Sequence, residues 1–575
     1  MAGAPGRVRL GIRVALLVVE HGTGVRRFSR VPAAERARRL QRLAAGRGIR
    51  HDLFLLLKAL ASFGYGRDAR VRAQLGIEQR CRTATEPPAA PRLVAEPPDG
   101  DERCDVVVVG SGAGGAAAAR VLAEAGLSVI VLEEGEHHDS RTYDPDPLAA
   151  LPMLYRDAGM TACEGRPVIP LPVGRCVGGT TVINSGTCFR APGDVLARWR
   201  DEFGVGWAAD LDADFEQLER DLSVAPVDPL TAGRNAELCR AGAEAIGAAN
   251  GPLLRNAGDV TCCGTCPTGC ELDAKQAAHV SELPRAAAAG AVVRPGVRVT
   301  EVVLESGRAV GVRAAGYEVR ARAVVLAGGA LGSPELLLRQ GIANSSGEVG
   351  RRLRIHPACW VGARFDEEVR GWDGVMQSWH VGEWQDRGLF LEATFTPFAF
   401  GAHWLPGAGE EFKRRVERYA DLAIIGVHLS DRSEGRLRVR GGALRIGYRL
   451  TGEDAALLRF GIARAADIHF AAGAREVYPQ VGAVATLAPG EQERVEHGKL
   501  RPSDLRLEAF HPMGTLRMGS DPSASVVSPS GETHDMPGLY VADASLFPSS
   551  LRVNPMMTVM ACARRVAHGL AERLA

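Results

Sequence analysis

The sequence lacks the features of a membrane-spanning or exported protein. No apolar run approaches the ~20 residues that a membrane-spanning helix needs. The apolar stretch 14–19 follows three arginines, but Glu20 ends it before it reaches the roughly 7 to 15 residues of a signal-peptide core. Arg26 and Arg27 superficially match a twin-arginine signal, yet no apolar run follows them. We therefore expect a cytoplasmic protein.

A large excess of basic charge is also missing, since 69 Lys and Arg residues face 68 Asp and Glu residues. A nucleic-acid-binding protein usually shows a basic excess, so no nucleic-acid partner is expected. With 575 residues, the chain is too long for one core, and with 46% hydrophobic residues it is too apolar for general disorder. Two or three folded domains are expected.

The sequence does contain a dinucleotide-binding pattern at residues 105–133. A short apolar run ends at Gly110, Gly112 and Gly115 follow at the start of an Ala-rich stretch, and a second apolar run ends at Glu133. The pattern predicts a strand, a tight turn at Gly110, a helix and a second strand. Gly112 would leave room for a pyrophosphate, Gly115 would allow close helix packing, and Glu133 would accept ribose hydroxyls. A Gly-rich turn in an unrelated α/β protein is the weaker alternative.

The first 85 residues predict a separate helical extension. Apolar residues recur at helical spacing near 10–18 and 53–60, and Pro32 with Glu35 starts an Arg-rich helix. Residues 7–63 are basic and amphipathic, so peripheral contact with a membrane is one hypothesis. Packing against the rest of the protein is the favoured one, because most such stripes face a protein core. A Pro-rich linker at 86–102 follows.

Three further regions indicate backbone close to a ligand or a second domain. Residues 173–190 combine many glycines with small hydroxyl residues, which let the backbone approach a flat or anionic ligand. Residues 322–338 predict a buried strand, a glycine turn and a helix that approach the same ligand. Strand patterns between 355 and 505 indicate an antiparallel sheet with covering helices.

Five motifs in one order make the chain resemble the glucose–methanol–choline (GMC) family of FAD-dependent oxidoreductases, from about residue 103 to the end. They are the nucleotide motif with Glu133, the loop 178–184, the turn 328–334, His511 with Gly514 and Thr515, and Asp543 with Asn554 and Pro555. Within that family the chain looks most like the long-chain alcohol oxidases and their bacterial relatives. Residues 188–192, a cysteine cluster and the helical extension carry that closer match.

The resemblance implies an α/β fold with a discontinuous Rossmann-type FAD-binding domain. Its three parts would be residues 103–195, 286–353 and 506–575. An α+β substrate domain, an antiparallel sheet plus helices, would comprise residues 354–505, with residues 196–285 as an insertion that holds the cysteine cluster. The helical extension, 1–85, would precede both domains.

The resemblance also implies which residues surround FAD. Some would hold the ADP part, Val299 would lie near the adenine, and Asp543 would contact the pyrophosphate or the ribityl chain. Others would face the flavin ring, where backbone N–H groups at a helix start could stabilise negative charge on the reduced ring. In chain order, the expected cofactor-binding residues are Gly110, Gly112, Gly115, Glu133, Gly178, Gly179, Thr180, Asn184, Val299, Asp543, Pro555 and Met556.

His511 is the expected catalytic base, by the resemblance and by its chemistry. Oxidation of an alcohol removes a hydride from carbon and a proton from oxygen, and a neutral imidazole suits the second step near pH 7. Asn554 can hydrogen-bond the same oxygen but cannot take its proton. Because Asn554 stands where other family members have a second histidine, the sequence leaves His511 as the single expected base.

Twelve cysteines are present, and four of them lie within nine residues. The eight scattered cysteines are expected as reduced, buried thiols. Cys262, Cys263, Cys266 and Cys270 have a spacing that could hold an iron–sulfur cluster or zinc. A structural loop without metal is the other hypothesis, and it is slightly favoured.

We therefore expect FAD-dependent oxidation of a small-molecule alcohol, plausibly long-chain or apolar, with oxygen or a quinone or cytochrome as the electron acceptor. One alternative is a sugar or sterol dehydrogenase that passes electrons to a quinone or cytochrome. Another is a non-catalytic flavin-binding subunit that docks to a membrane or partner through the N-terminal helices. The retained His511 argues against a fatty-acid photodecarboxylase, a further activity of the same family.

Overall fold

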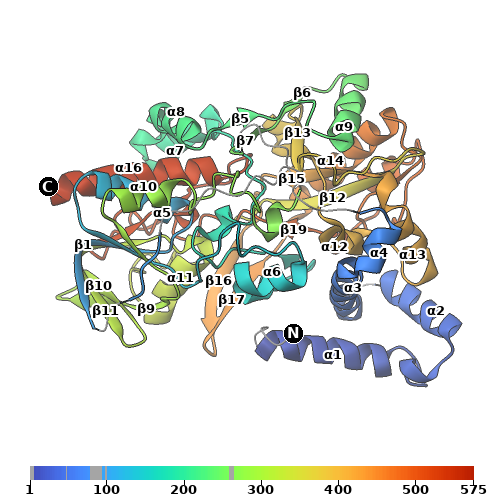
Figure 1. Cartoon of the computed structure of the whole chain (residues 1–575), viewed down its shortest axis with the longest axis horizontal. Coiled ribbons are helices and arrows are strands. Elements are labelled where there is room, and N and C mark those ends of the chain that lie inside the picture. Colours follow the sequence, from blue (N-terminus) through green and yellow to red (C-terminus); the bar gives the residue numbers. More distant parts are fainter. Residues whose placement is uncertain (1–5, 47, 78–92, 98–99, 258–263) are drawn as a thin grey trace.

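Two seven-stranded sheets form the body of the molecule within the residues that the structure describes (Figure 1). The computed structural model describes residues 6–46, 48–77, 93–97, 100–257 and 264–575. Most of the expected linker and two of the clustered cysteines, Cys262 and Cys263, lie outside these residues.

The first sheet has the strand order β8-β2-β1-β11-β10-β9, with β20 paired to β11. Strands β8, β2, β1, β11 and β20 run parallel, and β9 and β10 are antiparallel additions. The four apolar residues of β2 are all buried, as a central parallel strand requires. The strands are β1 (Glu102–Val109), β2 (Val129–Leu132), β8 (Val292–Arg294), β9 (Val299–Glu305), β10 (Arg308–Ala314), β11 (Tyr317–Leu326) and β20 (Leu539–Val541).

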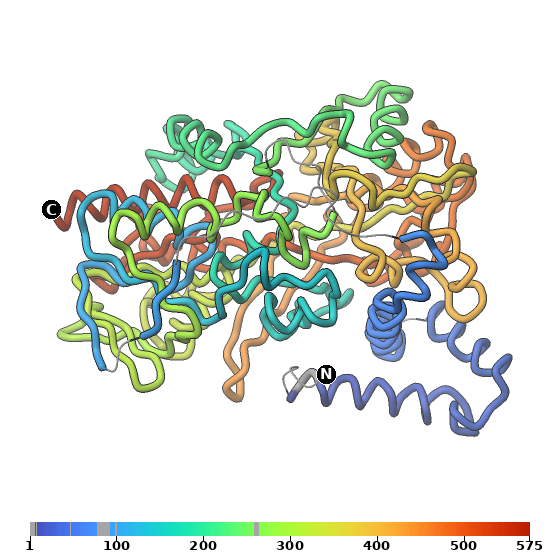
Figure 2. The backbone as a smooth tube through the Cα atoms, viewed as in Figure 1, coloured from blue at the N-terminus to red at the C-terminus, as the bar shows by residue number. Residues whose placement is uncertain are grey.

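The two ends of the FAD-binding region meet in this layer. Helix α5 (Ala113–Glu124) packs against α16 (Met556–Leu574) and α10 (Glu282–Ala288), and β20 pairs with the end of β11 beside β1. Figure 2 shows the C-terminal segment running alongside the segment that contains β1 and α5. Helix α11 (Gly329–Gln340) follows β11 directly. The expected discontinuous Rossmann-type α/β domain is confirmed.

Part of the segment expected in the substrate domain packs elsewhere. Helices α7 (Gly193–Phe203) and α8 (Asp212–Asp221) place Trp199 and Phe215 in the core of the first sheet, where Trp199 lies 5.1 Å from the Phe547 ring. By contrast, α9 (Arg234–Ala245) and β6 (Asn250–Pro252) join the second sheet. The expected boundary at residue 196 therefore does not coincide with the packing, because the apolar faces of α7 and α8 cover the first core.

The second sheet is antiparallel, in the order β18-β12-β15-β14-β13-β6, with β19 paired to β12. Helices α14 (Gly452–Ala471) and α9 cover it. Every residue of β15 is buried, so its apolar run faces protein on both sides. The remaining strands are β12 (Pro357–Arg364), β13 (Gln377–Val381), β14 (Leu389–Thr394), β15 (Leu422–Leu429), β18 (Glu476–Tyr478) and β19 (Glu508–Ala509).

Two strand patterns between 435 and 449 do not join this sheet. They form a separate hairpin of β16 (Gly435–Arg440) and β17 (Ala443–Tyr448), joined at Gly441 and Gly442. The hairpin packs on α11. Smaller elements are α6 (Pro147–Leu154), α12 (Phe398–Gly401), α13 (Glu410–Glu417), α15 (Glu493–Glu496), and the strand pairs β3 (Ala162–Cys163) with β4 (Ile169–Pro170) and β5 (Ala225–Pro226) with β7 (Leu254–Arg255).

The N-terminal extension is helical, as expected, and attaches to the substrate side. It comprises α1 (Gly6–Gly22), α2 (Ala33–Ala44), α3 (Ile49–Arg67) and α4 (Ala69–Gln74). Helix α3 packs on α12, where the Phe63 and Phe400 rings lie 5.7 Å apart. The buried Lys58 donates to the Gly407 carbonyl at 3.1 Å. Across the described part of the chain, no helix has the length and apolarity to cross a bilayer.

Candidate active site

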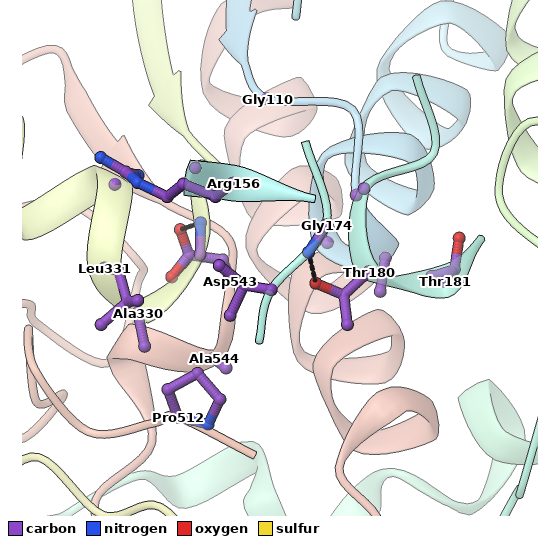
Figure 3. A pocket seen from close by; sticks show the side chains of 18 of the residues that line it. Gly110, Arg156, Gly174, Thr180, Thr181, Ala330, Leu331, Pro512, Asp543 and Ala544 are labelled. Carbon is purple, nitrogen blue, oxygen red and sulfur yellow. Dashed lines mark hydrogen bonds between the residues drawn. The ribbon is translucent and has the colours of Figure 1, made fainter. Parts of the chain in front are cut away.

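One cavity of about 800 Å³ runs between the two sheets and collects most of the residues singled out in the sequence. Its size is in the range of cofactor and ligand sites. Figure 3 shows Gly110 of the β1 turn, the glycine-rich loop (residues 173–190), α11 and the C-terminal segment around the same space. Among the expected cofactor residues, those lining it are Gly110, Gly112, Glu133, Gly179, Thr180, Asn184, Val299, Asp543, Pro555 and Met556.

Backbone packs against backbone at the nucleotide end of the cavity. Gly110 has φ +105°, and a Cβ there would lie 2.4 Å from the Ala327 carbonyl oxygen. A Cβ at Gly179 would lie 2.9 Å from Cα of Gly112, and one at Gly174 would lie 2.5 Å from the Gly179 carbonyl carbon. Larger residues at these positions would push the loops apart. Gly115 and Gly178 do not line the cavity, but a Cβ at Gly115 would overlap the Gly110 carbonyl, so this glycine lets helix α5 pack close.

The two predicted acids, Glu133 and Asp543, are buried and already accept hydrogen bonds from the protein. Glu133 accepts from Ser111 N (3.0 Å), Ser111 Oγ (2.7 Å) and Gly135 N (2.9 Å). Asp543 accepts from Gly329 N (2.8 Å) and from the Ser333 and Ser545 hydroxyls. Burial raises the pKa of both carboxyl groups, and these hydrogen bonds oppose that rise. Asp543 thus ties the α11 turn to the C-terminal segment, while its contact with a cofactor stays a prediction.

A buried lysine anchors the glycine-rich loop. Lys275 donates to the Val182 carbonyl at 2.8 Å and also to the Asn184 carbonyl. The Thr180 hydroxyl accepts from Gly174 N at 3.0 Å (Figure 3). Asn184 in turn donates to the Met556 sulfur at 3.2 Å, which joins the loop to the start of α16. The loop conformation therefore depends on Lys275, which sequence inspection did not single out.

Helix α16 begins at the cavity, with Pro555 as its N-cap and Met556 as its first residue. The N–H groups of the first turn of a 19-residue helix point along its axis and favour negative charge. Asn554 lies just before them, and its buried Oδ1 has no hydrogen-bond partner within the described residues. An unpaired buried acceptor at a cavity wall calls for a ligand donor.

His511 lies at the other end of the cavity, in contact with a second histidine. Its Nδ1 is 3.2 Å from Nδ1 of His356, and the two rings are nearly perpendicular. Leu551 N donates to Nε2 of His356 at 3.3 Å, which favours the His356 tautomer protonated at Nδ1. His356 then donates to His511, so neutral His511 carries its own proton on Nε2, the nitrogen left for a ligand.

Both imidazoles are held neutral by their surroundings. Burial lowers the pKa of His356 to about 3. Burial, followed by the nearby His356 and His428, holds the pKa of His511 well below its usual value of 6.5. A neutral His511 near pH 7 meets the protonation requirement of a general base.

A third histidine completes a cluster that the sequence did not predict. His428 on β15 lines the cavity, and its ring lies 6.1 Å from that of His511 at an angle of 26°. Nε2 of His428 is 2.8 Å from Oε2 of Glu392 on β14, a close contact without hydrogen-bond alignment. Glu392 is fully buried and also accepts from Gln377 at 3.3 Å. The expected single base therefore has two imidazole neighbours and a buried carboxylate behind them.

Apolar side chains surround this polar cluster. Trp360, Met376 and Phe510 line the same end of the cavity, together with the hydroxyl-bearing Thr396. Trp360 Nε1 donates to Glu508 at 2.9 Å, which fixes the indole, and burial raises the pKa of Glu508 to about 7. An apolar chamber with a few converging polar groups is typical of sites for small apolar ligands.

Weak signals in the sequence could have indicated the missed residues. His428 interrupts the otherwise apolar β15, and Glu392 interrupts the mostly apolar β14. A polar residue inside a fully buried strand needs a partner or a function. Which partner it finds depends on how strands distant in the sequence pair, and the sequence alone does not show that.

Only half of the cysteine cluster lies within the described residues. Cys266 is buried and its Sγ accepts from Arg255 at 3.6 Å, and Cys270 Sγ accepts from Lys275 N at 3.5 Å. Over the described ranges, no group of three His, Cys, Asp or Glu side chains is arranged so that it could hold a metal ion. The intervening Pro267 lines the cavity. The iron–sulfur or zinc hypothesis stays a prediction.

Known proteins resemble this chain in sequence and in fold. Residues 151–358 and 431–563 match the two GMC oxidoreductase family models, and residues 105–143 match an FAD binding domain. An uncharacterized GMC-type oxidoreductase of Mycobacterium tuberculosis is 37% identical over 97% of this chain and 90% of its own length. A long-chain-alcohol oxidase of Arabidopsis thaliana is 30% identical, over 80% of this chain and 67% of its own length.

Solved structures confirm the architecture. Pyridoxine 4-oxidase from Mesorbium loti superposes with a TM-score of 0.61 at 20% identity, covering 81% of this chain and 98% of that one. Formate oxidase from Aspergillus oryzae has a TM-score of 0.62 at 17% identity, covering 83% of this chain and 99% of that one.

These matches and the fold together define an FAD-dependent oxidoreductase. The cavity suits FAD, because glycine backbone at Gly110, Gly112 and Gly179 lines its nucleotide end beside the buried Glu133. The chain belongs to the GMC oxidoreductase family.

Proposed function

We propose that this protein oxidises an apolar, long-chain alcohol, with His511 as the proton acceptor. The observation that carries this proposal is the continuity of one cavity. It extends from Gly110 and Glu133 at the nucleotide end to His511 and Asn554 at the other, where Trp360 and Phe510 supply apolar walls. The similarity to a long-chain-alcohol oxidase supports the same substrate class.

His511 and Asn554 would hold the alcohol oxygen between them. In the ligand-free tautomers the hydroxyl can donate to the unpaired Oδ1 of Asn554 while its oxygen accepts from Nε2–H of His511, and it must turn its O–H group toward Nε2 before the proton can transfer. FAD, when bound, supplies the hydride acceptor at its N5 atom. Trp360, Met376 and Phe510 would exclude water and position the alkyl chain.

Proton transfer to His511 requires a change of tautomer. In the ligand-free arrangement Nε2 of His511 carries a proton, because His356 donates to Nδ1. Acceptance at Nε2 needs the opposite tautomers: the His356 proton crosses to Nδ1 of His511, the Nε2 proton of His511 leaves to solvent water, and Nε2 of His356 takes up a proton in exchange, so that Leu551 N loses its acceptor. We place this exchange at alcohol binding. Once His511 is protonated, the buried Glu392 beside His428 is the nearest counter-charge of the cluster.

Anaerobic mixing of the purified flavoprotein with a panel of alcohols tests the proposal. Bleaching of the flavin absorbance by long-chain primary alcohols, with little response to sugars or sterols, is the expected result. Readmission of oxygen should restore the yellow colour, since the oxidase relative favours oxygen as the acceptor. Bleaching by sugars or sterols with slow reoxidation in air would support the dehydrogenase alternative, and no bleaching by any alcohol would support a non-catalytic flavin-binding subunit.

A further inference from the structure

Positive charge is concentrated in the N-terminal extension. Residues 1–77 contain 16 Arg and Lys residues against 4 Asp and Glu, whereas the whole chain has 69 against 68. The rest of the chain is therefore net negative. A near-neutral protein with such an asymmetry presents one strongly positive region to its surroundings.

Helix α1 has two apolar faces, and only one of them is covered. Ile12 and Ala15 are buried on the face that packs toward α3. Leu10, Val14 and Leu17 lie on the opposite face and are 62%, 42% and 58% exposed. Residues at i, i+4 and i+7 form one stripe along a helix, so the exposed stripe is continuous. Figure 1 shows α1 along the lower edge of the molecule, away from both sheets.

Arginines flank this stripe without acidic partners. Arg9 and Arg13 on α1 are exposed, as are Arg26, Arg27 and Arg30 in the connection to α2. None of these five forms an ion pair with another described residue, and the nearby Glu20 instead accepts from the Ser29 backbone and hydroxyl. Apolar and cationic groups thus share one uncovered surface.

These features favour an anionic lipid bilayer over other occupants. A second copy of the chain would bring the same positive charge against itself, which opposes pairing through this face. Nucleic acid would use the arginines but would leave the leucines in water. A basic helix with exposed aliphatic residues suits the interface of a membrane, where the aliphatic side chains enter the acyl boundary and the arginines meet phosphates.

We propose that α1 and residues 23–31 form a peripheral binding surface for membranes that contain anionic phospholipid. Through α3 the surface is fixed to α12 and to the chain near Thr396, which lines the cavity. A membrane-bound molecule would thereby hold its substrate side next to the bilayer, where long-chain alcohols partition. The binding itself does not depend on the proposed alcohol chemistry.

Co-sedimentation of the full-length flavoprotein with vesicles tests the surface. Vesicles of phosphatidylcholine alone are compared with vesicles containing about 30 mol% phosphatidylglycerol, at low and at roughly 0.5 M salt. We expect binding to the anionic vesicles, at least about tenfold weaker binding to the neutral ones, and loss of most binding at high salt. Equal binding to both kinds of vesicle, or none to either, would overturn the proposal.

Two variants separate the apolar and the charged contributions. L10S/V14S/L17S removes the stripe, and R9Q/R13Q removes two flanking charges; each should weaken anionic-vesicle binding by about tenfold or more. Matched controls are L230S, at a leucine that is 93% exposed elsewhere, and R438Q/R440Q on the exposed side of β16, which should bind like the unmodified protein.

Flavin absorbance, thermal unfolding and flavin reduction by a soluble short-chain alcohol should stay unchanged in all four variants, since the altered side chains are exposed and none of them lines the cavity. If light scattering instead shows a dimer of the unmodified protein that L10S/V14S/L17S dissociates, the stripe is an interface between copies and the lipid proposal fails. Retained vesicle binding with no alcohol activity would refute the proposed function alone.

Discussion

The two ends of the cavity are built in different ways. At the nucleotide end, backbone segments touch one another: a Cβ at Gly114 would overlap the Ala542 carbonyl, and one at Gly174 would collide with Gly179. At the proposed alcohol end, where His511 lies, side chains from separate strands meet. His428 lies beside His511, and Glu392 lies beside His428. The backbone contacts of the nucleotide end leave room only for glycine, whereas the other end depends on contacts between imidazole and carboxylate side chains.

This difference separates two kinds of failure. A substitution at the nucleotide end should prevent the fold from closing around FAD, so every property is lost together. A substitution at the alcohol end should leave the fold and FAD in place while the chemistry slows. The following changes are ordered from the largest expected effect to the smallest.

G114V should abolish FAD binding and destabilise the protein by about 3 kcal/mol or more, because the added side chain must displace the backbone of the C-terminal segment. The FAD content of the purified protein and its thermal unfolding measure this. G569A is the control, since a Cβ there meets open space in α16 and the substitution should be neutral or stabilising. A variant G114V that retains stoichiometric FAD would show that β20 and α5 are not packed as described.

H511A should keep FAD but slow flavin reduction by the best alcohol by about 10² to 10⁴-fold, the range for losing a general base. Stopped-flow reduction under anaerobic conditions measures the rate. H497A serves as the control, because His497 is 69% exposed and distant from the cavity wall. Near-normal reduction by H511A would remove this residue from the chemistry and leave His428 as the alternative base.

The same contrast explains how much the sequence could predict. Gly110, Gly112, Gly179 and Glu133 were predicted because a backbone conformation demands particular residues at fixed spacing, and such demands show as motifs. His511 was predicted with them, because it lies in the C-terminal segment of the same domain.

The partners of His511 were not predictable in this way. His356, Glu392 and His428 lie 155, 119 and 83 positions before it, on or next to strands whose pairing fixes their distances only after folding. The packing of α7 and α8 was missed for a related reason. Their amphipathic patterns predict helices, but an apolar face does not specify which of two cores it covers.

E392Q should slow flavin reduction by roughly tenfold, because it removes the negative charge behind His428 while keeping the shape of the side chain. FAD content should not change. The exposed Glu368 on the same domain provides the control substitution E368Q. A loss as large as that of H511A would mean that Glu392 acts directly in proton transfer, and no loss would mean that the cluster needs no counter-charge.

The smallest expected effect concerns pH. The proposed proton transfer needs neutral His511, and burial holds the pKa of His511 well below 6.5, so the imidazole is neutral at every pH above that lowered value. The rate of flavin reduction should therefore be nearly constant from about pH 6 to pH 8, without the fall near pH 6.5 that an unperturbed histidine would cause.

Nitrogen-15 NMR of labelled histidines, assigned with H511Q and H356Q, checks the protonation state of His511 directly. Ligand-free His511 should remain neutral with its proton on Nε2, and an unreactive alcohol analogue should move the proton to Nδ1. A proton on Nδ1 of His511 before any ligand binds would make the tautomer exchange unnecessary. Titration of His511 near pH 6.5 would show that water reaches its ring, contrary to the packed arrangement of the cluster.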